Sequence, residues 1–386
     1  MTFYDDLETR DDAQRRAEQL VAVNALLEAP LASLADLASL PVLRKSDLVA
    51  AQKAQPPFGG MHVSNADYVF QSPGPIYEPG SRAEDWWRFG RFLTACGIGS
   101  DDIIQNCFGY HLTPAGTMFE NGARAVGAKV LPAGTGQTEL QARAAHDIGT
   151  TAYAGTPDYL KVILEKADEM GLPLKITKAA VSGGALFPQL RQFYADRGIA
   201  CLQCYATADL GQIAYETAEG QGMIVDEGVI VEIVTPGTGD VVPEGEVGEV
   251  VVTSLNPDYP LIRFATGDLS AVMTGKSPCG RTNLRIKGWM GRADQTAKIK
   301  GMFVRPEQVA DLVARVPGAD RARVVVDRDN DADTMKVLIE GTGIDEAHAT
   351  KSVADVLKLR GDVVCVEPDH IPRDGLVIED LRTYET

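Results

Sequence analysis

The segment "PDYPLIRFATGDLS" closes an apolar run with Thr-Gly-Asp, of which Asp268 is the carboxylate. A carboxylate on a tight turn at the end of a strand can accept two hydrogen bonds from the diol of a ribose. An ordinary turn uses the same residue types, so the tripeptide alone is weak support. It gains weight from the nearby segment "CGRTNLRIKGWMGRADQTAKIKGMFVRPEQV", in which Arg292 and Asp294 follow Gly291.

A second stretch, "VFQSPGPIYEPGSR" (69–82), is similar to a phosphate-binding loop in its Ser72, Gly74 and Gly80. Such loops hold phosphates with backbone N–H groups and with a lysine or a hydroxyl. Here three prolines stand between Gln71 and Gly80, and the stretch has no threonine and no lysine. Each proline removes a backbone donor, and no ammonium group can offset phosphate charge. The stretch therefore has the form of a phosphate loop without its chemistry.

Other chemistry-bearing patterns are weaker. Cys201 and Cys204 form a C-x-x-C that could bind a metal with Cys279 or His111. Because a second paired Cys/His motif is absent, buried reduced thiols are the favoured interpretation. The chain contains no G-x-S-x-G motif, so a hydrolase triad has no support.

The elements that must position these residues change in type along the chain. Residues of about 10–55 have a helical period, and residues of about 100–205 alternate apolar strands with helical patterns, which is typical of a parallel sheet covered by helices. After Gly222 the chain is β-rich with Pro, Gly and Asp turns, which predicts antiparallel strands. From Gly291 the order β-α-β-β-α-β predicts a small α+β domain of roughly 90 residues. We predict a large domain over 1–291 and a small one over 292–386.

Composition limits the class of protein. At 386 residues the chain is long enough for two or three domains, and 45% hydrophobic with 24% charged residues is ordinary for a globular protein. The formal charge of −17 argues against nucleic acid or anionic membrane as a partner. No apolar run is long enough to cross a bilayer, the N-terminus is acidic and polar, and six cysteines do not indicate a disulfide scaffold. A cytoplasmic protein is expected.

Taken in order, the segments resemble the adenylate-forming acyl-CoA synthetase superfamily, and within it the phenylacetate–coenzyme A ligase branch. Matching segments are "YDDLETRDDAQRRAEQL", "LASLADLASLPVLRKSDL", "TAYAGTPDYL", "AVSGGALFPQLR", "CYATADLGQIAYE", "PLIRFATGDLS" and "CGRT…GRADQTAKIKGMFVRPEQV". Seven collinear matches are far more specific than any single motif. The resemblance implies a large N-terminal region of two helix-covered sheets plus a distorted β-barrel, followed by a small mobile C-terminal domain.

The resemblance also implies roles for single residues. Asp268 would hold the AMP ribose, Arg292 would contact the ribose or a phosphate, and Asp294 would be the hinge. One turn would lie against the adenine, where the lack of side chains lets backbone approach a flat base. That turn is Ser182, Gly183, Gly184 and Ala185. A strand-to-helix turn that needs glycine is the alternative interpretation.

Further roles concern the phosphates and the acid. In "YATADLG", Tyr205 would lie near the adenine and Thr207 near the phosphate, while Asp209 would help to hold Mg²⁺ in place of the usual glutamate. A solvated loop carboxylate is the alternative for Asp209. Thr207, Asp209 and Arg292 are thus the predicted catalytic residues. An aromatic acyl pocket would be formed by Phe108, Tyr110 and His111. The alternative interpretation is that these side chains only pack against the sheet edge.

Two segments depart from the family pattern. In relatives a Ser/Thr/Gly-rich loop that ends in lysine surrounds the β- and γ-phosphates of ATP, and "FQSPGPIYEPG" stands in its place. The pattern Leu-Pro-Arg-Ser-Glu-Gly-Lys is here "HIPRDGLVIEDLR", in which Leu376 follows Gly375, and no lysine occurs after Lys358. The catalytic lysine of adenylation is therefore missing, and its loss would slow that step by about a hundredfold to a thousandfold. Lys298 or Lys300 could substitute for it.

Three hypotheses follow. The first is ATP-dependent, AMP-forming activation of a small carboxylic acid, with an aromatic acid favoured, and transfer of the acyl group to coenzyme A. It requires ATP, Mg²⁺ and CoA, and it leaves a homodimer open. The second is a degenerate homologue that binds AMP, CoA or an acyl-CoA without turnover. The third is a half-reaction that starts from a preformed acyl-adenylate.

Overall fold

The computed structural model describes residues 2–61, 63–72, 75–295, 297–299, 302–329, 332–373 and 376–382, except the side chains of residues 294, 298, 302, 303, 328, 329 and 332. The chain divides into two compact units. The first unit comprises Met1–Thr266 and Ala271–Trp289, and the second comprises Gly267–Ser270 and Met290–Thr386. Each unit is described by itself.

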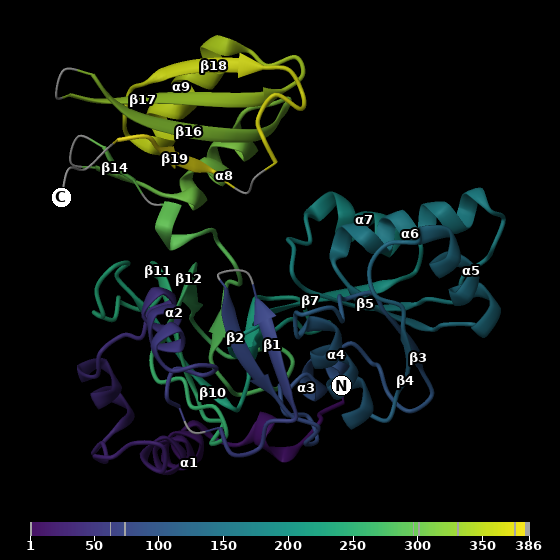
Figure 1. Ribbon diagram of the computed structural model, residues 1–386. Helices are drawn as coiled ribbons and strands as arrows, with labels where there is room; N and C mark the ends of the chain where they lie inside the picture. Colours follow the sequence, from purple (N-terminus) through teal and green to yellow (C-terminus); the bar gives the residue numbers. More distant parts are fainter. Residues whose placement is uncertain are drawn as a thin grey trace. The chain divides into compact units, whose positions relative to one another are not determined.

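The first unit is built on one continuous sheet of 11 strands, in the order β10-β11-β12-β13-β9-β8-β7-β6-β5-β3-β4. Strands β3 to β7 pair in parallel (Figure 1), and the pairs β7–β8, β8–β9, β9–β13, β13–β12 and β10–β11 are antiparallel. The strands span Ile103–Asn106 (β3), Lys129–Pro132 (β4), Ala152–Gly155 (β5), Lys178–Val181 (β6), Ala200–Thr207 (β7), Gly211–Tyr215 (β8), Met223–Val225 (β9), Val229–Val234 (β10), Val247–Ser254 (β11), Phe264–Met273 (β12) and Arg285–Ile286 (β13).

Helices of the first unit begin at residues suited to a helix N-terminus. The Asp11 carboxylate accepts a hydrogen bond from the Gln14 N–H at 2.8 Å and so caps α1, and α6 and α7 begin at Pro157 and Pro188. The helices are η1 (Asp6–Thr9), α1 (Asp12–Asn24), η2 (Leu34–Ser39), α2 (Lys45–Ala54), α3 (Gly90–Ala95), α4 (Ala115–Ala125), α5 (Thr138–Ile148), α6 (Pro157–Glu169) and α7 (Pro188–Asp196).

Side-chain alternation along the parallel strands makes two cores, one on each face of the sheet. On one face Ala152 and Ala154 pack in a cluster with side chains of α3 and α4, and on the other Tyr153 packs with side chains of α6 and α7. Figure 1 shows these helix pairs on opposite sides of the strands. Both faces of the parallel part are thus covered, as its near-continuous apolar strands require.

The expected α/β and α+β fold class is confirmed. The strands that were expected in two sheets and a distorted barrel form a single hydrogen-bonded sheet, and no closed barrel is found in the described ranges. The connection is made by two short strands, since β13 pairs with β12 on one side and with β9 on the other. These strands contain only two and three residues, too few for a recognisable period in the sequence.

The proline-containing stretch forms a β-hairpin. Strands β1 (Tyr68–Ser72) and β2 (Ile76–Gly80) pair antiparallel, and Pro73 and Gly74 lie outside the described residues. The Gln52 side chain on α2 fixes β2, because its Nε2 donates to the Tyr77 carbonyl oxygen at 2.7 Å and its Oε1 accepts from the Tyr77 N–H at 2.8 Å.

The second unit has a sheet in the order β18-β17-β16-β19 and one apolar core beneath its two helices. The prediction of a simple β-α-β-β-α-β order needs two corrections. "AKIKGMFV" is a separate two-stranded hairpin rather than one strand, and a short final strand pairs in parallel with β16. The elements are η3 (Ala293–Gln295), β14 (Ala297–Ile299), β15 (Met302–Val304), α8 (Pro306–Arg315), β16 (Ala319–Asp329), β17 (Ala332–Gly341), α9 (Glu346–Leu357), β18 (Asp362–Val366) and β19 (Ile378–Asp380).

Over the described part of the chain, no helix combines the length and the apolar character needed to span a membrane.

Candidate active site

The carboxyl ends of the parallel strands bring several predicted residues to one edge of the sheet. Of the predicted residues, Phe108 follows β3, Ser182 follows β6, and Tyr205 lies near the end of β7; Thr156, which was not predicted, follows β5. These strands are parallel neighbours, so their carboxyl ends lie at the same edge. Open parallel sheets bind ligands at this edge. Residues that are far apart in the sequence are therefore placed around one candidate ligand site.

The Ser182–Ala185 turn is held by its polar groups and leaves its backbone open. The Ser182 hydroxyl donates to the carbonyl oxygen of Cys204 at 3.1 Å, and the Gln203 Nε2 donates to the Gly184 carbonyl oxygen at 3.2 Å. Gly183 has φ +71°, a conformation that L side chains rarely adopt, and both glycines are exposed. A Cβ atom at Gly183 would lie 3.7 Å from the Phe108 ring. The predicted adenine turn and one predicted pocket residue are therefore neighbours.

The three residues of the predicted acyl pocket differ in their surroundings. Phe108 is 8% exposed and its ring stacks on Phe119 with centroids 4.4 Å apart, so most of it packs in the core. The Tyr110 hydroxyl accepts a hydrogen bond from the Asn106 Nδ2 at 2.8 Å, and burial raises the pKa of Tyr110. His111 is exposed. Core packing thus accounts for much of Phe108, and the pocket role of all three stays a prediction.

The end of β7 carries the predicted phosphate and metal residues. The register between β7 and β8 shifts between Tyr205 and Ala206, so the strand is irregular where the motif begins. The Thr207 hydroxyl accepts a hydrogen bond from the Leu210 N–H at 3.2 Å and closes the following turn. Asp209 is buried, and its Oδ2 accepts a hydrogen bond from the Lys45 Nζ at 3.3 Å. Asp209 is therefore not the solvated loop carboxylate that was left as an alternative.

Sequence reasoning missed a buried carboxylate on β2. Glu78 on β2 is 1% exposed, so its carboxylate is buried. Burial and the charge of Asp209 raise the pKa of Glu78 to about 7, although Ser72 and Lys45 act to lower it. Nothing in "PIYEPG" marks this glutamate, because its burial depends on the tertiary fold. Lys45 was missed for the same reason.

In the second unit, Asp268 and Arg292 are brought together. The Arg292 Nη1 donates to the Asp268 Oδ1 at 3.1 Å, and the two residues form an isolated antiparallel bridge. Gly267, which directly precedes Asp268, has φ +74°. A Cβ atom at this position would lie 2.7 Å from the Arg292 Nη2. The glycine of Thr-Gly-Asp is therefore needed for this pair. The side chain of Asp294 lies outside the described residues.

The end of the chain does not provide a lysine in the described ranges. Arg373 of the surviving Pro-Arg is exposed and pairs with Asp369 at 2.7 Å, and Leu376 is exposed. Gly375 lies outside the described residues, as do Lys300 and the side chain of Lys298. The substitution of the missing lysine by Lys298 or Lys300 stays a prediction.

The C-x-x-C motif lies on β7, where Cys201 packs in the cluster beneath α6 and α7 and Cys204 in the cluster beneath α3 and α4. The two thiols therefore lie on opposite faces of the sheet and cannot share a metal ion. Burial raises the pKa of each to about 12. No group of three or more His, Cys, Asp or Glu side chains suited to a metal ion occurs in the described part of the chain.

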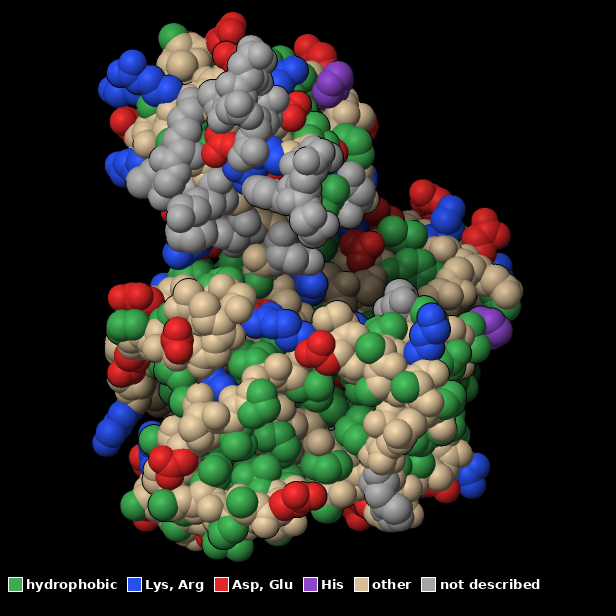
Figure 2. Space-filling model, turned by 60° about the vertical axis from the view of Figure 1, so that its left-hand side comes forward, with side chains coloured by type: hydrophobic (Ala, Val, Ile, Leu, Met, Phe, Trp, Pro, Cys, Tyr) green, Lys and Arg blue, Asp and Glu red, His purple; other side chains and the backbone are tan. Residues whose placement is uncertain are grey.

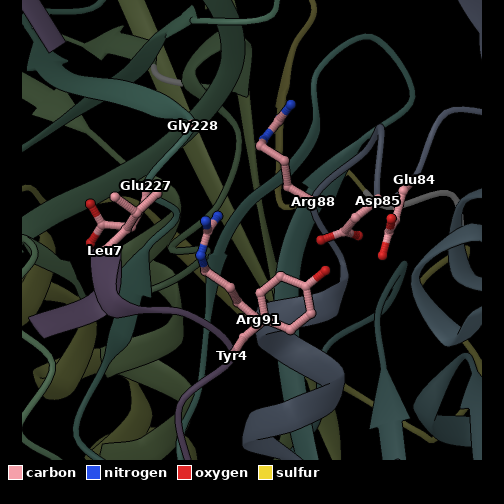
Figure 3. A pocket seen from close by; sticks show the side chains of 8 residues that line it. All are labelled: Tyr4, Leu7, Glu84, Asp85, Arg88, Arg91, Glu227 and Gly228. Atoms are coloured by element: carbon pink, nitrogen blue, oxygen red, sulfur yellow. The ribbon is translucent and has the colours of Figure 1, made fainter. Parts of the chain in front are cut away.

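A cavity of about 410 Å³ in the first unit is a separate feature (Figure 3). None of the predicted site residues lines it. Its arginines are paired, since the Arg91 Nη1 and the Arg88 Nε lie 3.1 and 3.3 Å from the Asp226 carboxylate. Its lining residues are Tyr4, Leu7, Glu84, Asp85, Arg88, Arg91, Glu227 and Gly228. With its arginines compensated, the cavity offers little to an anionic nucleotide.

On the face drawn in Figure 2, lysine and arginine side chains are scattered among acidic ones and form no single basic patch. This distribution agrees with the net charge of −17. It offers no electrostatic footprint for nucleic acid on that face.

Solved structures define the class of the fold. A 2-hydroxyisobutyryl-CoA ligase, crystallised in an open conformation with 2-HIB-AMP and CoA, aligns with TM-score 0.80 and 24% identity over 96% of this chain and 93% of that one. Apo MatB from Rhodopseudomonas palustris aligns with TM-score 0.59 and 16% identity over 84% of this chain and 70% of that one. The fold is that of the adenylate-forming acyl-CoA synthetases.

Sequence comparison is more specific. The phenylacetate–coenzyme A ligase of Aromatoleum evansii is 30% identical over 329 residues, which cover 80% of this chain and 73% of the relative. That of Thermus thermophilus is 29% identical over 326 residues, which cover 80% and 72%. No protein-family model matches the chain. The protein belongs to the phenylacetate–coenzyme A ligase family.

Proposed function

We propose that this protein activates a small carboxylic acid, with an aromatic acid preferred, and transfers it to coenzyme A. The acid carboxylate attacks the α-phosphate of ATP, which gives an acyl-adenylate and pyrophosphate. The CoA thiol then attacks the acyl carbon, which gives the thioester and releases AMP. One observation carries the proposal: the turn suited to adenine lies against the aromatic Phe108, so a nucleotide and an aromatic acid would be bound side by side.

The residues support distinct parts of this reaction. The exposed glycines of the Ser182–Ala185 turn offer a flat surface to adenine, and Tyr205, which is largely buried, would lie near the base. Asp268 would accept hydrogen bonds from the ribose, and Arg292, which pairs with that carboxylate at 3.1 Å, would contact the ribose or a phosphate. Thr207 offers a hydroxyl to the phosphates. Such preorganised groups lower the barrier when they face the charge that develops in the transition state.

Mg²⁺ fits the Asp209 position. The Asp209 Oδ1 is buried without a hydrogen-bond partner among the described residues, and carboxylate oxygens are ligands that Mg²⁺ prefers. Asp209 would hold the ion. When bound, it would offset the negative charge of the nucleotide phosphates.

The proline-containing stretch and the missing C-terminal lysine also support two alternatives, a protein that only binds its ligands and an enzyme that performs only the second half-reaction. Without the C-terminal lysine, adenylation would be slower by about a hundredfold to a thousandfold. A protein that only binds AMP, CoA or acyl-CoA would show saturable affinity and no turnover. A half-reaction enzyme would act only when it is supplied with the acyl-adenylate. A cytoplasmic location, a mobile second unit with its hinge at Asp294, and a homodimer belong to the same proposal.

The test is AMP release by the purified protein with Mg-ATP, CoA and a panel of aryl and short-chain acids. AMP that requires both the acid and CoA supports the ligase, and the best acid identifies the substrate. Asp268→Asn is the site variant, and Asp240→Asn, in the turn between β10 and β11, is the control. No AMP from any acid, with AMP or CoA still bound, would replace the ligase by the binding protein or by the half-reaction enzyme.

A further inference from the structure

The segment between β3 and α4, residues 107–114, is fixed at its base by one buried side chain. We call this segment the pocket loop, because it contains the three predicted pocket residues. Asn106, at the end of β3, is 1% exposed, and its Nδ2 donates to the Tyr110 hydroxyl and to the Gly116 carbonyl oxygen, each at 2.8 Å. Its Oδ1 accepts a hydrogen bond from the Phe108 N–H at 3.2 Å. The base of the pocket loop is therefore held in one position relative to the sheet.

The far end of the pocket loop is held by the β1–β2 hairpin. The Gln71 N–H on β1 donates to the Leu112 carbonyl oxygen at 2.9 Å. Leu112 has φ +65°, a left-handed conformation that is costly for a residue with a side chain. Because that side chain is 57% exposed, its packing contributes little to the conformation. Strained backbone persists where the surrounding structure determines it, and the hydrogen bond from Gln71 supplies such a constraint.

The outward-facing backbone donors of the hairpin are used within the protein. Residue pairs along an antiparallel ladder alternate between inward-facing and outward-facing groups. Gln71 and Tyr77 lie opposite each other, and their N–H groups point away from the ladder, to the pocket loop and to the Gln52 Oε1. The next outward-facing pair is Val69 and Pro79, and proline has no N–H. Phosphate loops bind through free backbone N–H groups, so the described residues of the two strands present one such donor at most.

We propose that the β1–β2 hairpin positions the pocket loop, through the hydrogen bond from Gln71 to Leu112, and so controls the affinity for an aromatic carboxylic acid rather than for the phosphates of ATP. The inference rests on the proposed function for the identity of the ligand. Core packing supports it, because Phe70 on β1 belongs to the same buried cluster as Phe108 of the pocket loop. The Phe108 ring in turn neighbours the Gly183 turn. Gln71 is thus a positioning residue, since it acts through the pocket loop.

One substitution removes the connection between the hairpin and the pocket loop. Gln71→Pro removes the donor, and because this N–H points away from the ladder, the pairing of β1 with β2 is kept. Val69→Pro is the matched control: its N–H lies on the same edge of β1, and no hydrogen bond from it to the pocket loop is found among the described residues. AMP release is measured with the best acid of the panel, and KM is determined separately for the acid and for ATP.

The expected result is a change in KM for the acid alone. Gln71→Pro should raise the KM for the acid about threefold to tenfold, as expected for the loss of one hydrogen bond, and leave the KM for ATP unchanged. Val69→Pro should leave both values as in wild type. A general defect of β1 would change both values and would affect both variants.

Variants of Leu112 keep the test decisive if Gln71→Pro misfolds. Leu112→Val leaves the hairpin intact but places a β-branched residue at positive φ, where such residues are outliers, so it should raise the KM for the acid about threefold or more. Glycine adopts this conformation freely, so Leu112→Gly added to Gln71→Pro should return that KM to within about twofold of wild type. A change in a different segment could not repair a damaged strand.

Hydrogen exchange of the full chain, followed by mass spectrometry, reports on the same connection without turnover. Peptides that cover residues 107–114 should exchange faster in Gln71→Pro and Leu112→Val than in wild type and Val69→Pro, because local opening becomes easier when a constraint is lost. Peptides that cover residues 178–185 should exchange at the same rate in all four proteins.

Three results would overturn the inference: a Gln71→Pro variant that raises the KM for ATP instead of the KM for the acid, a loss that Leu112→Gly does not repair, or unchanged exchange of the pocket loop. The inference and the proposed function can fail independently. AMP formation whose KM for the acid ignores Gln71 would keep the ligase and remove the inference. No AMP from any acid, with faster exchange of the pocket loop in Gln71→Pro alone of the two proline variants, would remove the ligase and leave the hairpin as the element that holds this loop.

Discussion

A pair of glycine substitutions tests whether the Ser182–Ala185 turn faces a nucleotide. Gly183 and Gly171 both have positive φ, +71° and +66°. Alanine at either position adds the strain of the left-handed conformation, about 1–2 kcal/mol. The added Cβ meets no atom within 4 Å at Gly171 and only atoms at 3.7 Å at Gly183, which is ordinary contact. Neither substitution produces a clash, so the two should destabilise the first unit equally.

Their effects on the nucleotide should differ. Gly183 lies at the candidate site, and a methyl group there would hold a flat base away from the backbone. Gly171 follows the end of α6, at the far end of that helix from Pro157 and the turn. Gly183→Ala is therefore expected to weaken AMP binding at least tenfold, which is about 1.4 kcal/mol, while Gly171→Ala leaves it unchanged.

The assay is calorimetric titration with AMP, with melting temperatures measured alongside. Each kcal/mol of lost stability lowers the melting temperature by about 2–4 °C in domains of a few hundred residues, so comparable losses in both variants establish that the strain is matched. If Gly183→Ala binds AMP as tightly as Gly171→Ala does, the turn does not face the base, and the assignment of adenine to it is wrong.

Other predictions concern charges. Asp268→Asn and Arg292→Ala should each weaken AMP binding at least tenfold by calorimetry, while urea unfolding changes by about 1 kcal/mol or less because the pair is partly exposed. Burial raises the pKa of Asp85 to about 7, so ionisation of this carboxyl opposes folding. The free energy of unfolding of wild type, measured by urea titration, should therefore fall by at most about 4 kcal/mol as the pH rises from 4 to 7. Asp85→Asn should flatten this pH profile. Glu8→Gln should cost about 3–5 kcal/mol in urea unfolding, because it leaves the buried Arg281 without its carboxylate; an unchanged midpoint would contradict this.

The sequence predicted those parts of the fold that depend on local pattern. Alternating apolar runs and glycine-ended helices indicated the parallel strands and their helices, and Thr-Gly-Asp indicated the turn that pairs with Arg292. Strands of two or three residues, such as β13 and β9, have too little pattern to predict, and so the continuity of the large sheet was missed.

The surroundings of Asp209 could not be predicted from local sequence pattern. Lys45 and Asp209 come from a helix start and a loop, and only the tertiary fold brings them together. A glutamate in a short strand is unremarkable until its burial is known. The resemblance to the family located the missing lysine, but it could not say what stands in its place.

The contacts of helix α2 limit how a lysine-containing phosphate loop could be introduced into this protein. Gln52 on this helix holds Tyr77 by both backbone groups, and Lys45 at its first turn pairs with Asp209. Hairpin, helix and Asp209 loop are thus one interlocked module. A graft that exchanged only residues 69–82 for a relative's loop would replace the strand that Gln52 holds through both backbone groups of Tyr77. Successful chimeras should therefore carry the donor's α2 together with its loop.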